Sequence, residues 1–231
     1  MLHGCVGQVW RRLFFQYGIG ILSFVVWRLD DVPDHSLLPP AGEHAALAGS
    51  LLWRGISGLV SLLMFFYCLT ELPLATAISL NYTWPLFVAL FSTLILKEHM
   101  HWPLICAILV GFAGVILLLR PTLPEDHWMA GLLGIASGFF AAIAYINVKQ
   151  LGNLGESEWH VVFYFTLIST LATGLWLLFT AFSPITWHGL LLLGTGITAT
   201  LAQLAMTRAY HQGATLVVTS LGYSTVLFAS L

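Results

Sequence analysis

The chain has 231 residues, of which 58% are hydrophobic and 8% are charged, and its formal net charge is −2 at pH 7. Soluble domains carry about 25% charged residues, and a soluble fold of this length could not bury so much apolar surface. The composition therefore excludes an ordinary soluble protein and predicts a membrane protein in contact with the lipid bilayer. The charge gives no indication of a nucleic-acid partner.

The membrane spans are predicted from runs of about 20 mostly apolar residues, the length that crosses a hydrocarbon core of ~30 Å as a helix. Lipid cannot satisfy backbone N–H and C=O groups, so each span is helical. The first candidate, 13–27, is short. The seven that follow in chain order are 51–72, 75–96, 103–119, 129–148, 161–182, 190–209 and 214–231. The predicted fold is an all-α integral membrane protein with about eight transmembrane helices.

The links between the spans support these boundaries. The stretch 30–49 is polar, contains Pro33, Pro39 and Pro40, and is predicted to be an irregular loop. Tryptophans concentrate at membrane interfaces. Those near predicted span ends are Trp27, Trp53, Trp102, Trp128, Trp159 and Trp187.

Basic residues predict the orientation, because Lys and Arg are enriched in cytoplasmic links. One set of alternate links contains Arg28, Arg54, Lys97, Lys149 and Arg208, whereas the opposite set contains Arg120 after the first span. We therefore expect a multi-pass protein of the cytoplasmic (inner) membrane with the Lys97 and Lys149 links in the cytoplasm. Arg11 and Arg12, which precede the first span, indicate the opposite orientation.

The chain contains a weak internal repeat. SLNYTWPLF at 79–87 aligns without gaps on SLGYSTVLF at 220–228, 141 positions later, and five of nine positions are identical. Five spans begin within that distance, and an odd number inverts the second copy in the membrane, as in many secondary carriers. Chance similarity between two apolar helices is the alternative interpretation.

A five-span repeat predicts ten helices. Because the second copy stops at Leu231 and the first begins with span 13–27, we expect the first and tenth helices of an inverted five-plus-five architecture to be missing. The predicted domains are residues 13–120, a first repeat without its first helix, and residues 129–231, a second repeat without its last helix.

Several motifs together resemble the drug/metabolite transporter (DMT) superfamily, EamA type. They are LPLATA at 72–77, NYTWPLF at 81–87, LKE at 96–98 and GFAGVILL at 111–118, with a looser match at RAY, 208–210, and at 223–228. The resemblance covers about 47–231 and implies two EamA-like repeats, ten helices, cytoplasmic termini and transport of a small metabolite or drug-like solute by alternating access. The missing end helices depart from that pattern, and a truncated, non-transporting membrane remnant is the alternative.

The best candidate solute site lies around Pro85, in the middle of the span 75–96. Proline has no N–H, so it frees the carbonyl of Asn81, four residues earlier. Asn81, Tyr82 and Thr83 add polar groups at the same depth, and Trp84 could stack on an aromatic or cationic solute. Unwound backbone beside polar side chains is how carriers bind solutes. The alternative is a packing kink whose polar groups bond to neighbouring helices.

Other polar or charged residues of the spans are weaker candidates. Tyr145, Asn147, Gln203 and Tyr223, the repeat mate of Tyr82, could line a central cavity or form interhelical hydrogen bonds. Arg54 and Glu71 are charged residues near the membrane, predicted mainly as interfacial anchors, with Arg54 the better candidate for solute contact. Gly134 and Gly138 form a Gly-x-x-x-Gly motif, which predicts close helix packing.

The sequence contains no motif for catalysis or ATP hydrolysis. The patterns H-E-x-x-H, G-x-S-x-G and Walker A are all absent. Cys5, Cys68 and Cys106 form no C-x-x-C pair, so no metal site or cofactor is predicted. A membrane-embedded enzyme is therefore the weakest hypothesis. A small-molecule solute is the expected partner, with an ion or proton gradient or exchange as the driving force; the oligomeric state is not indicated.

Overall fold

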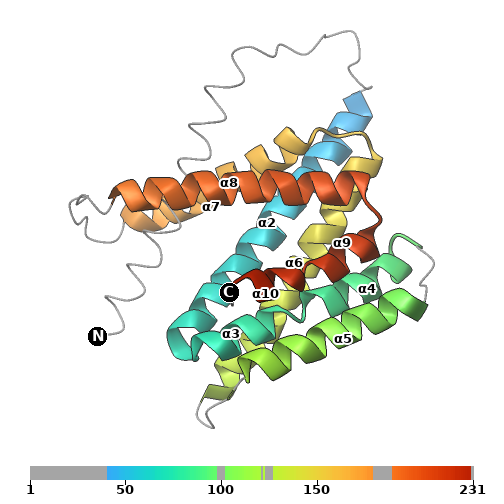
Figure 1. Cartoon of the computed structure of the whole chain (residues 1–231). Coiled ribbons are helices and arrows are strands. Elements are labelled where there is room, and N and C mark those ends of the chain that lie inside the picture. Colours follow the sequence, from blue (N-terminus) through green and yellow to red (C-terminus); the bar gives the residue numbers. More distant parts are fainter. Residues whose placement is uncertain (1–40, 98–101, 121, 123–126, 179–188, 230–231) are drawn as a thin grey trace. The chain divides into compact units, whose positions relative to one another are not determined.

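The structure is a computed structural model that describes residues 41–97, 102–120, 122, 127–178 and 189–229. Its helices are α2 (Ala41–Glu71), α3 (Leu74–Asn81), α4 (Trp84–Leu94), α5 (Trp102–Leu119), α6 (Trp128–Asn153), α7 (Glu158–Leu178), α8 (Gly189–Gln212), α9 (Thr215–Leu221) and α10 (Ser224–Ala229) (Figure 1). These described ranges contain no β-strand, which confirms the predicted all-α class. The predicted span 13–27 lies outside them.

Helices long and apolar enough to cross a bilayer occur at three places in the described chain, namely Leu47–Glu71, Leu74–Leu94 and Trp128–Asn153. Shorter apolar helices cover Trp102–Leu117 and Thr215–Val226. These five segments agree in position with five of the predicted spans, and α7 (Glu158–Leu178) and α8 (Gly189–Gln212) overlap two more. A total of eight spans and an inverted arrangement of two repeats remain predictions.

The predicted irregular loop 30–49 is wrong in its second part, because α2 begins at Ala41. The segment after Pro40 reads AGEHAALAG, and its four alanines are the strongest helix formers among the amino acids. Their propensity outweighs that of the two glycines, and the helix continues without interruption into the apolar run that follows.

The chain divides into two compact units. The first unit comprises residues 1–56 and 155–208, and the second comprises residues 57–154 and 209–231. The boundaries fall inside α2 and near the end of α8, so this division differs from the one between the predicted repeats, which is based on sequence alone. The second unit contains most of the predicted site.

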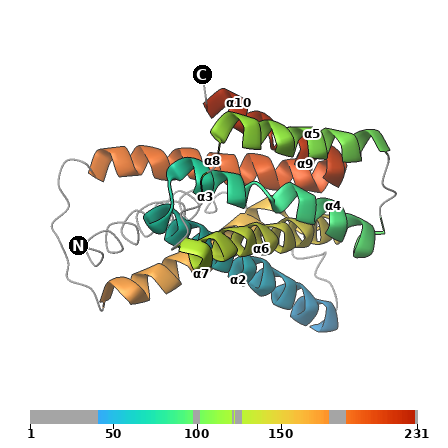
Figure 2. The same ribbon diagram turned by 90° about the horizontal axis from the view of Figure 1, so that it is seen from below.

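Within the second unit, α4 packs against α6 and α9, and α5 packs against α9. Figure 2 shows α3 and α4 end to end alongside α6. Gly134 and Gly138 permit this contact, because a Cβ atom at Gly134 would lie 2.9 Å from the side chain of Leu80, and one at Gly138 would lie 2.4 Å from Oγ1 of Thr83. The predicted role of the Gly-x-x-x-Gly motif in close packing is confirmed.

Apolar clusters hold the second unit together. One joins α5 to α9 and α10 through Ile108, Val115, Leu216, Tyr223 and Val226. A second, smaller cluster joins α6 to α2 and α3, and a third joins α6 to α4. The hydrocarbon core of a bilayer contains no water to drive apolar side chains together. Within a membrane these contacts therefore stabilise the unit chiefly by close packing rather than by the hydrophobic effect.

Candidate functional site

The predicted kink at Pro85 coincides with a short turn that breaks the apolar segment Leu74–Leu94 into two helices. α3 ends at Asn81 and α4 begins at Trp84, with Pro85 in its first turn. The amide of Thr83 turns back to the carbonyl of Leu80 at 3.2 Å, and the amide of Leu86 bonds to the carbonyl of Thr83 at 3.0 Å. Pro85 supplies no N–H to the carbonyl of Asn81 and suits the start of the new helix.

A second break separates α9 from α10. α9 ends at Leu221, α10 begins at Ser224, and Gly222 and Tyr223 form the turn between them. α9 starts at Thr215, 141 residues after α3 starts at Leu74, and the same separation lies between Tyr82 and Tyr223. This break contains no proline. The two segments therefore share a helix start and a break, as a repeat predicts, although the repeat itself remains a prediction.

The two breaks are in contact with each other. The ring of Tyr223 stacks on that of Tyr82, with centroids 6.1 Å apart and planes at 26°. The hydroxyl of Tyr223 donates to the backbone carbonyl of Tyr82 at 3.4 Å. Gly222 lies against the indole of Trp84, since a Cβ atom there would be 2.8 Å from the end of the ring. Each break thus provides an aromatic side chain that contacts the other.

Asn81 belongs to a small polar network. Its Nδ2 donates to Oγ of Ser137 at 3.0 Å, and that hydroxyl donates to the carbonyl of Gly134 at 2.6 Å. Oγ of Ser61, on α2, donates to the carbonyl of Ser137 at 2.8 Å. Asn81 therefore has the interhelical hydrogen bond that the packing interpretation expected, and a role in solute binding remains a proposal.

Aromatic contacts extend from the first break to the end of α8. Trp84 meets the ring of Tyr145 edge-on, with centroids 4.7 Å apart, and Tyr145 lies parallel to Tyr210 at 5.3 Å. Tyr210 was not among the predicted site residues. Its place in the RAY motif at 208–210 was the one signal in the sequence, and that motif does not show which helix the ring contacts.

Comparison with known proteins decides the family. Residues 8–120 match the model of the EamA-like transporter family. The chain is 32% identical over 210 residues to the pseudopaline exporter CntI of Pseudomonas aeruginosa (strain UCBPP-PA14), which covers 89% of this chain and 70% of that protein. The chain belongs to the EamA-like transporter family. The predicted resemblance is confirmed, and so is the assignment to membrane transport proteins.

Two further similarities agree with the family. A riboflavin transporter of Vibrio cholerae serotype O1 is 33% identical over 142 residues, which are 60% of this chain and 46% of that protein. A solved crystal structure superposes with a TM-score of 0.77, at 18% identity, and covers 99% of this chain and 82% of that chain. At that identity the superposition shows a common fold.

Asn147 and Glu71, two other predicted site residues of this EamA-family protein, contact residues outside the breaks, and a third, Gln203, belongs to the first unit. Nδ2 of Asn147 donates to the carbonyl of Ile143 in its own helix at 3.0 Å. Gln203 lies on α8 in the first unit. Glu71 ends α2 and lies 3.8 Å from Nε2 of His127. The structure thus groups six predicted residues, which are Asn81, Tyr82, Thr83, Trp84, Tyr145 and Tyr223.

Arg54, predicted mainly as an interfacial anchor and otherwise as a solute contact, lies inside a helix that is longer than the predicted span, and both roles remain predictions. It lies within α2, which begins at Ala41, and its side chain is buried in the first unit with 3% of its surface exposed. Its guanidinium carbon is 4.6 Å from the centroid of the Phe165 ring. A cation over an aromatic face is favourable, and this contact ties α2 to α7.

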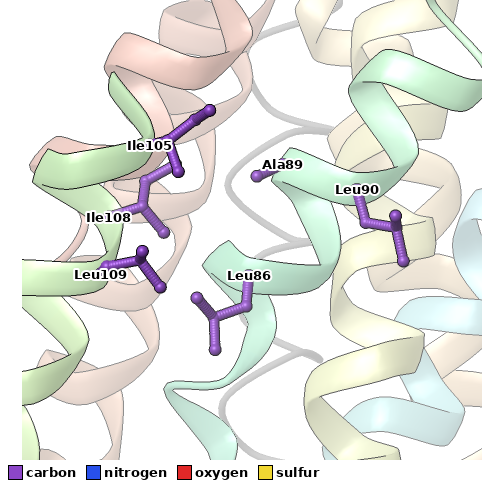
Figure 3. A pocket seen from close by; sticks show the side chains of 6 residues that line it. All are labelled: Leu86, Ala89, Leu90, Ile105, Ile108 and Leu109. Carbon is purple, nitrogen blue, oxygen red and sulfur yellow. The ribbon is translucent and has the colours of Figure 1, made fainter. Parts of the chain in front are cut away.

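An apolar pocket of about 190 Å³ lies between α4 and α5 (Figure 3). Its lining consists of Leu86, Ala89, Leu90, Ile105, Ile108 and Leu109. All six side chains are aliphatic, so none can donate or accept a hydrogen bond. Such a pocket offers no group that could orient a polar solute. None of the site residues predicted for this protein lines it.

Proposed function

We propose that the protein is a secondary transporter that moves a small metabolite or drug-like solute across the cytoplasmic membrane by alternating access. One observation carries the proposal: the turns that break two apolar helices, at Tyr82 and at Tyr223, lie against each other. Non-helical backbone is tolerated within a membrane where protein buries it or where it lines a solute cavity. Discontinuous helices that meet near a repeat interface are the usual solute sites of secondary carriers.

The proposed solute site consists of the side chains around these two breaks. Asn81 and Thr83 supply polar atoms, and the carbonyl of Asn81 receives no N–H from Pro85. Tyr82, Trp84 and Tyr145 are only half-buried, so their rings can take part in further contacts. Such a surface suits a planar or cationic solute with a polar rim. The similarity to a riboflavin transporter is consistent with a planar solute.

The direction of transport and its coupling form a separate part of the proposal. One relative is named as an exporter, so flux is to be measured in both directions. The chain has no P-loop motif, and we propose that an ion or proton gradient, or exchange, drives the movement. We also propose that the Lys97 and Lys149 links face the cytoplasm. Labelling of single cysteines in these links from either side of the membrane tests the orientation.

Solute flux in proteoliposomes tests the function. The probes are riboflavin, adenosine, tryptophan and ethidium, each measured with and without a pH gradient. We expect at least one to move, and we expect Asn81→Ala and Tyr82→Phe to raise its KM by about threefold or more, the effect of losing one hydrogen bond within a membrane. The matched control is Thr93→Val, whose hydroxyl bonds to a carbonyl of its own helix.

Two results would contradict the proposal in different ways. If none of the probes moves although the protein is inserted, transport by this chain is rejected for these classes and the remnant hypothesis is favoured. If a probe moves but both variants transport it with the wild-type KM, transport stands and the proposed site at the breaks is wrong.

A further inference from the structure

Five residues next to the second break contact one another in a closed circuit, in which each member contacts two others, and Tyr210 is one of the five. The ring of Tyr210 stacks on Tyr145, Tyr145 contacts Trp84, Trp84 lies on Gly222, and Thr219, three residues before Gly222, bonds to Tyr210. These residues come from α4, α6, α9 and the end of α8, all in the second unit. A circuit of this kind restrains each member through two neighbours.

The hydroxyl of Tyr210 has a defined role in this circuit. It lies 3.0 Å from Oγ1 of Thr219, and both groups are buried. Oγ1 of Thr219 donates its single proton to the carbonyl of Thr215 at 2.7 Å. A hydroxyl has one proton and two lone pairs, so Tyr210 is the donor to Thr219. The tyrosine thereby attaches α9 to the ring stack on α6.

Thr219 occupies the last turn of α9 before the break. Its carbonyl accepts a hydrogen bond from the amide of Gly222 at 3.1 Å. Gly222 in turn leaves room for the indole of Trp84, because a Cβ atom would lie 2.8 Å from that ring. The bond from Tyr210 to Thr219 therefore restrains the turn on which Trp84 rests.

The ring of Tyr210 restrains Trp84 from the other side. It is 1% exposed and lies parallel to Tyr145, with planes at 4° and centroids 5.3 Å apart. Tyr145 then meets Trp84 at 63° and 4.7 Å. Offset and edge-to-face arrangements of aromatic rings are favoured over other orientations. A phenylalanine at position 210 would keep this stack and lose the attachment to α9.

We propose that Tyr210 is a positioning residue of the solute site: its ring orients Tyr145 and its hydroxyl orients the break of α9, so that Trp84 is held from both sides. The inference rests on the proposed function, because Trp84 is there a solute contact. Tyr210 acts through its neighbours and is not itself a solute contact. Tyr210→Phe and Thr219→Val remove the same hydrogen bond from its two ends and preserve the shape of both side chains.

The first test observes Trp84 without any solute. In protein labelled with 5-fluorotryptophan, the ¹⁹F resonance of Trp84 is the one lost in Trp84→Phe. We expect this resonance to shift in Tyr210→Phe and in Thr219→Val, and the double variant to shift no further than either single one. The matched control is Thr166→Val, a buried threonine in the first unit whose hydroxyl bonds to carbonyls of its own helix. An unmoved Trp84 resonance in both single variants overturns the inference.

The second test separates positioning from mere stability. For the probe among riboflavin, adenosine, tryptophan and ethidium that wild-type protein transports, we expect Tyr210→Phe and Thr219→Val to raise KM by about threefold and to leave the maximal rate nearly unchanged. A shifted resonance with wild-type KM overturns the inference, because the bond would then be structural only. If none of the probes moves, the proposed function fails, and the resonance alone decides whether Tyr210 positions Trp84.

Discussion

Tyr82 and Tyr223 lie 141 residues apart in the chain and stack on each other, with ring centroids 6.1 Å apart. The hydroxyl of Tyr223 also reaches the backbone carbonyl of Tyr82 at 3.4 Å. The contact joins the two broken helices at their turns, where the amides of Thr83 and Tyr223 bond to the carbonyls three residues back, those of Leu80 and Ser220. Solute sites of secondary carriers lie where helices are discontinuous, so this joint is the place to test for movement during transport.

Crosslinking tests whether this joint opens during transport. In protein with Cys5, Cys68 and Cys106 replaced by Ser, Tyr82→Cys and Tyr223→Cys together place two thiols at the joint. We expect a short bifunctional maleimide to lower the flux of the transported probe several-fold if the proposed alternating access moves the two breaks relative to each other. Flux is compared before and after the reagent in the same variant. The monofunctional maleimide and the two single-cysteine variants are controls, and undiminished flux in the crosslinked pair would show that the joint stays closed.

Gly222→Ala is expected to destabilise the protein through a side-chain clash. The glycine has an ordinary helical backbone, with φ −55°, so its backbone does not require glycine. A Cβ atom would lie 2.8 Å from the Trp84 ring, which Tyr145 holds in place. Overpacking of this kind costs about 1–3 kcal/mol. Thermal unfolding in detergent measures the effect.

Gly114→Ala on α5 is the matched control for that substitution. Nothing lies within 4 Å of a Cβ atom at Gly114. Alanine is the better helix former by about 1 kcal/mol, so this variant is expected to unfold at the same temperature or a higher one. Equal stabilities of the two glycine variants would contradict the contact between Gly222 and Trp84.

Gly138→Ala is expected to be more damaging than Gly222→Ala. Its Cβ atom would lie 2.4 Å from Oγ1 of Thr83, 3.0 Å from the carbonyl oxygen of Asn81 and 3.1 Å from the amide of Trp84. Two of these neighbours are backbone atoms, which cannot move aside as a side chain can, so we expect a loss of about 3 kcal/mol in the free energy of unfolding. Adding Thr83→Ala removes the hydroxyl contact alone and should restore only part of the loss. Full recovery in this double variant would show that the backbone does not limit the approach of α6.

Ser137→Ala tests the network around Asn81. Ser137 is fully buried and accepts a hydrogen bond from Nδ2 of Asn81. Bonds between membrane helices contribute about 0.6 kcal/mol on average and up to about 1.7 kcal/mol. We expect a loss in that range, and we expect Asn81→Ala combined with Ser137→Ala to cost less than the sum of the single changes. The free energy of unfolding in detergent, measured for all three variants, gives the coupling.

The control for that cycle is Ser79→Ala. Ser79 is also buried, but its hydroxyl bonds to the carbonyl of Ala75 in its own helix. Because its hydroxyl does not bond to Ser137 or Asn81, we expect Ser79→Ala to couple to Asn81→Ala more weakly than Ser137→Ala does. A strictly additive result for the pair Asn81 and Ser137 would instead mean that their hydrogen bond contributes nothing to stability.

Local features of the chain were predictable from its sequence. The membrane class follows from composition, and the all-α fold follows because lipid leaves helices as the way to satisfy the backbone of such spans. The break at Pro85 follows from the missing N–H of proline. The prediction of a loop over 30–49 overlooked the alanines after Pro40, whose helix propensity starts α2 at Ala41.

The contacts between helices were decided by the tertiary structure. The sequence indicated that Tyr82 and Tyr223 are equivalent positions, but their stacking depends on how α4 packs against α9. Tyr210 was missed because its partners, Tyr145 and Thr219, come from different helices. Asn147 turned out to bond to its own helix. A sequence pattern reports the period of one helix, whereas the partner of a polar or aromatic side chain depends on the direction in which packed helices cross.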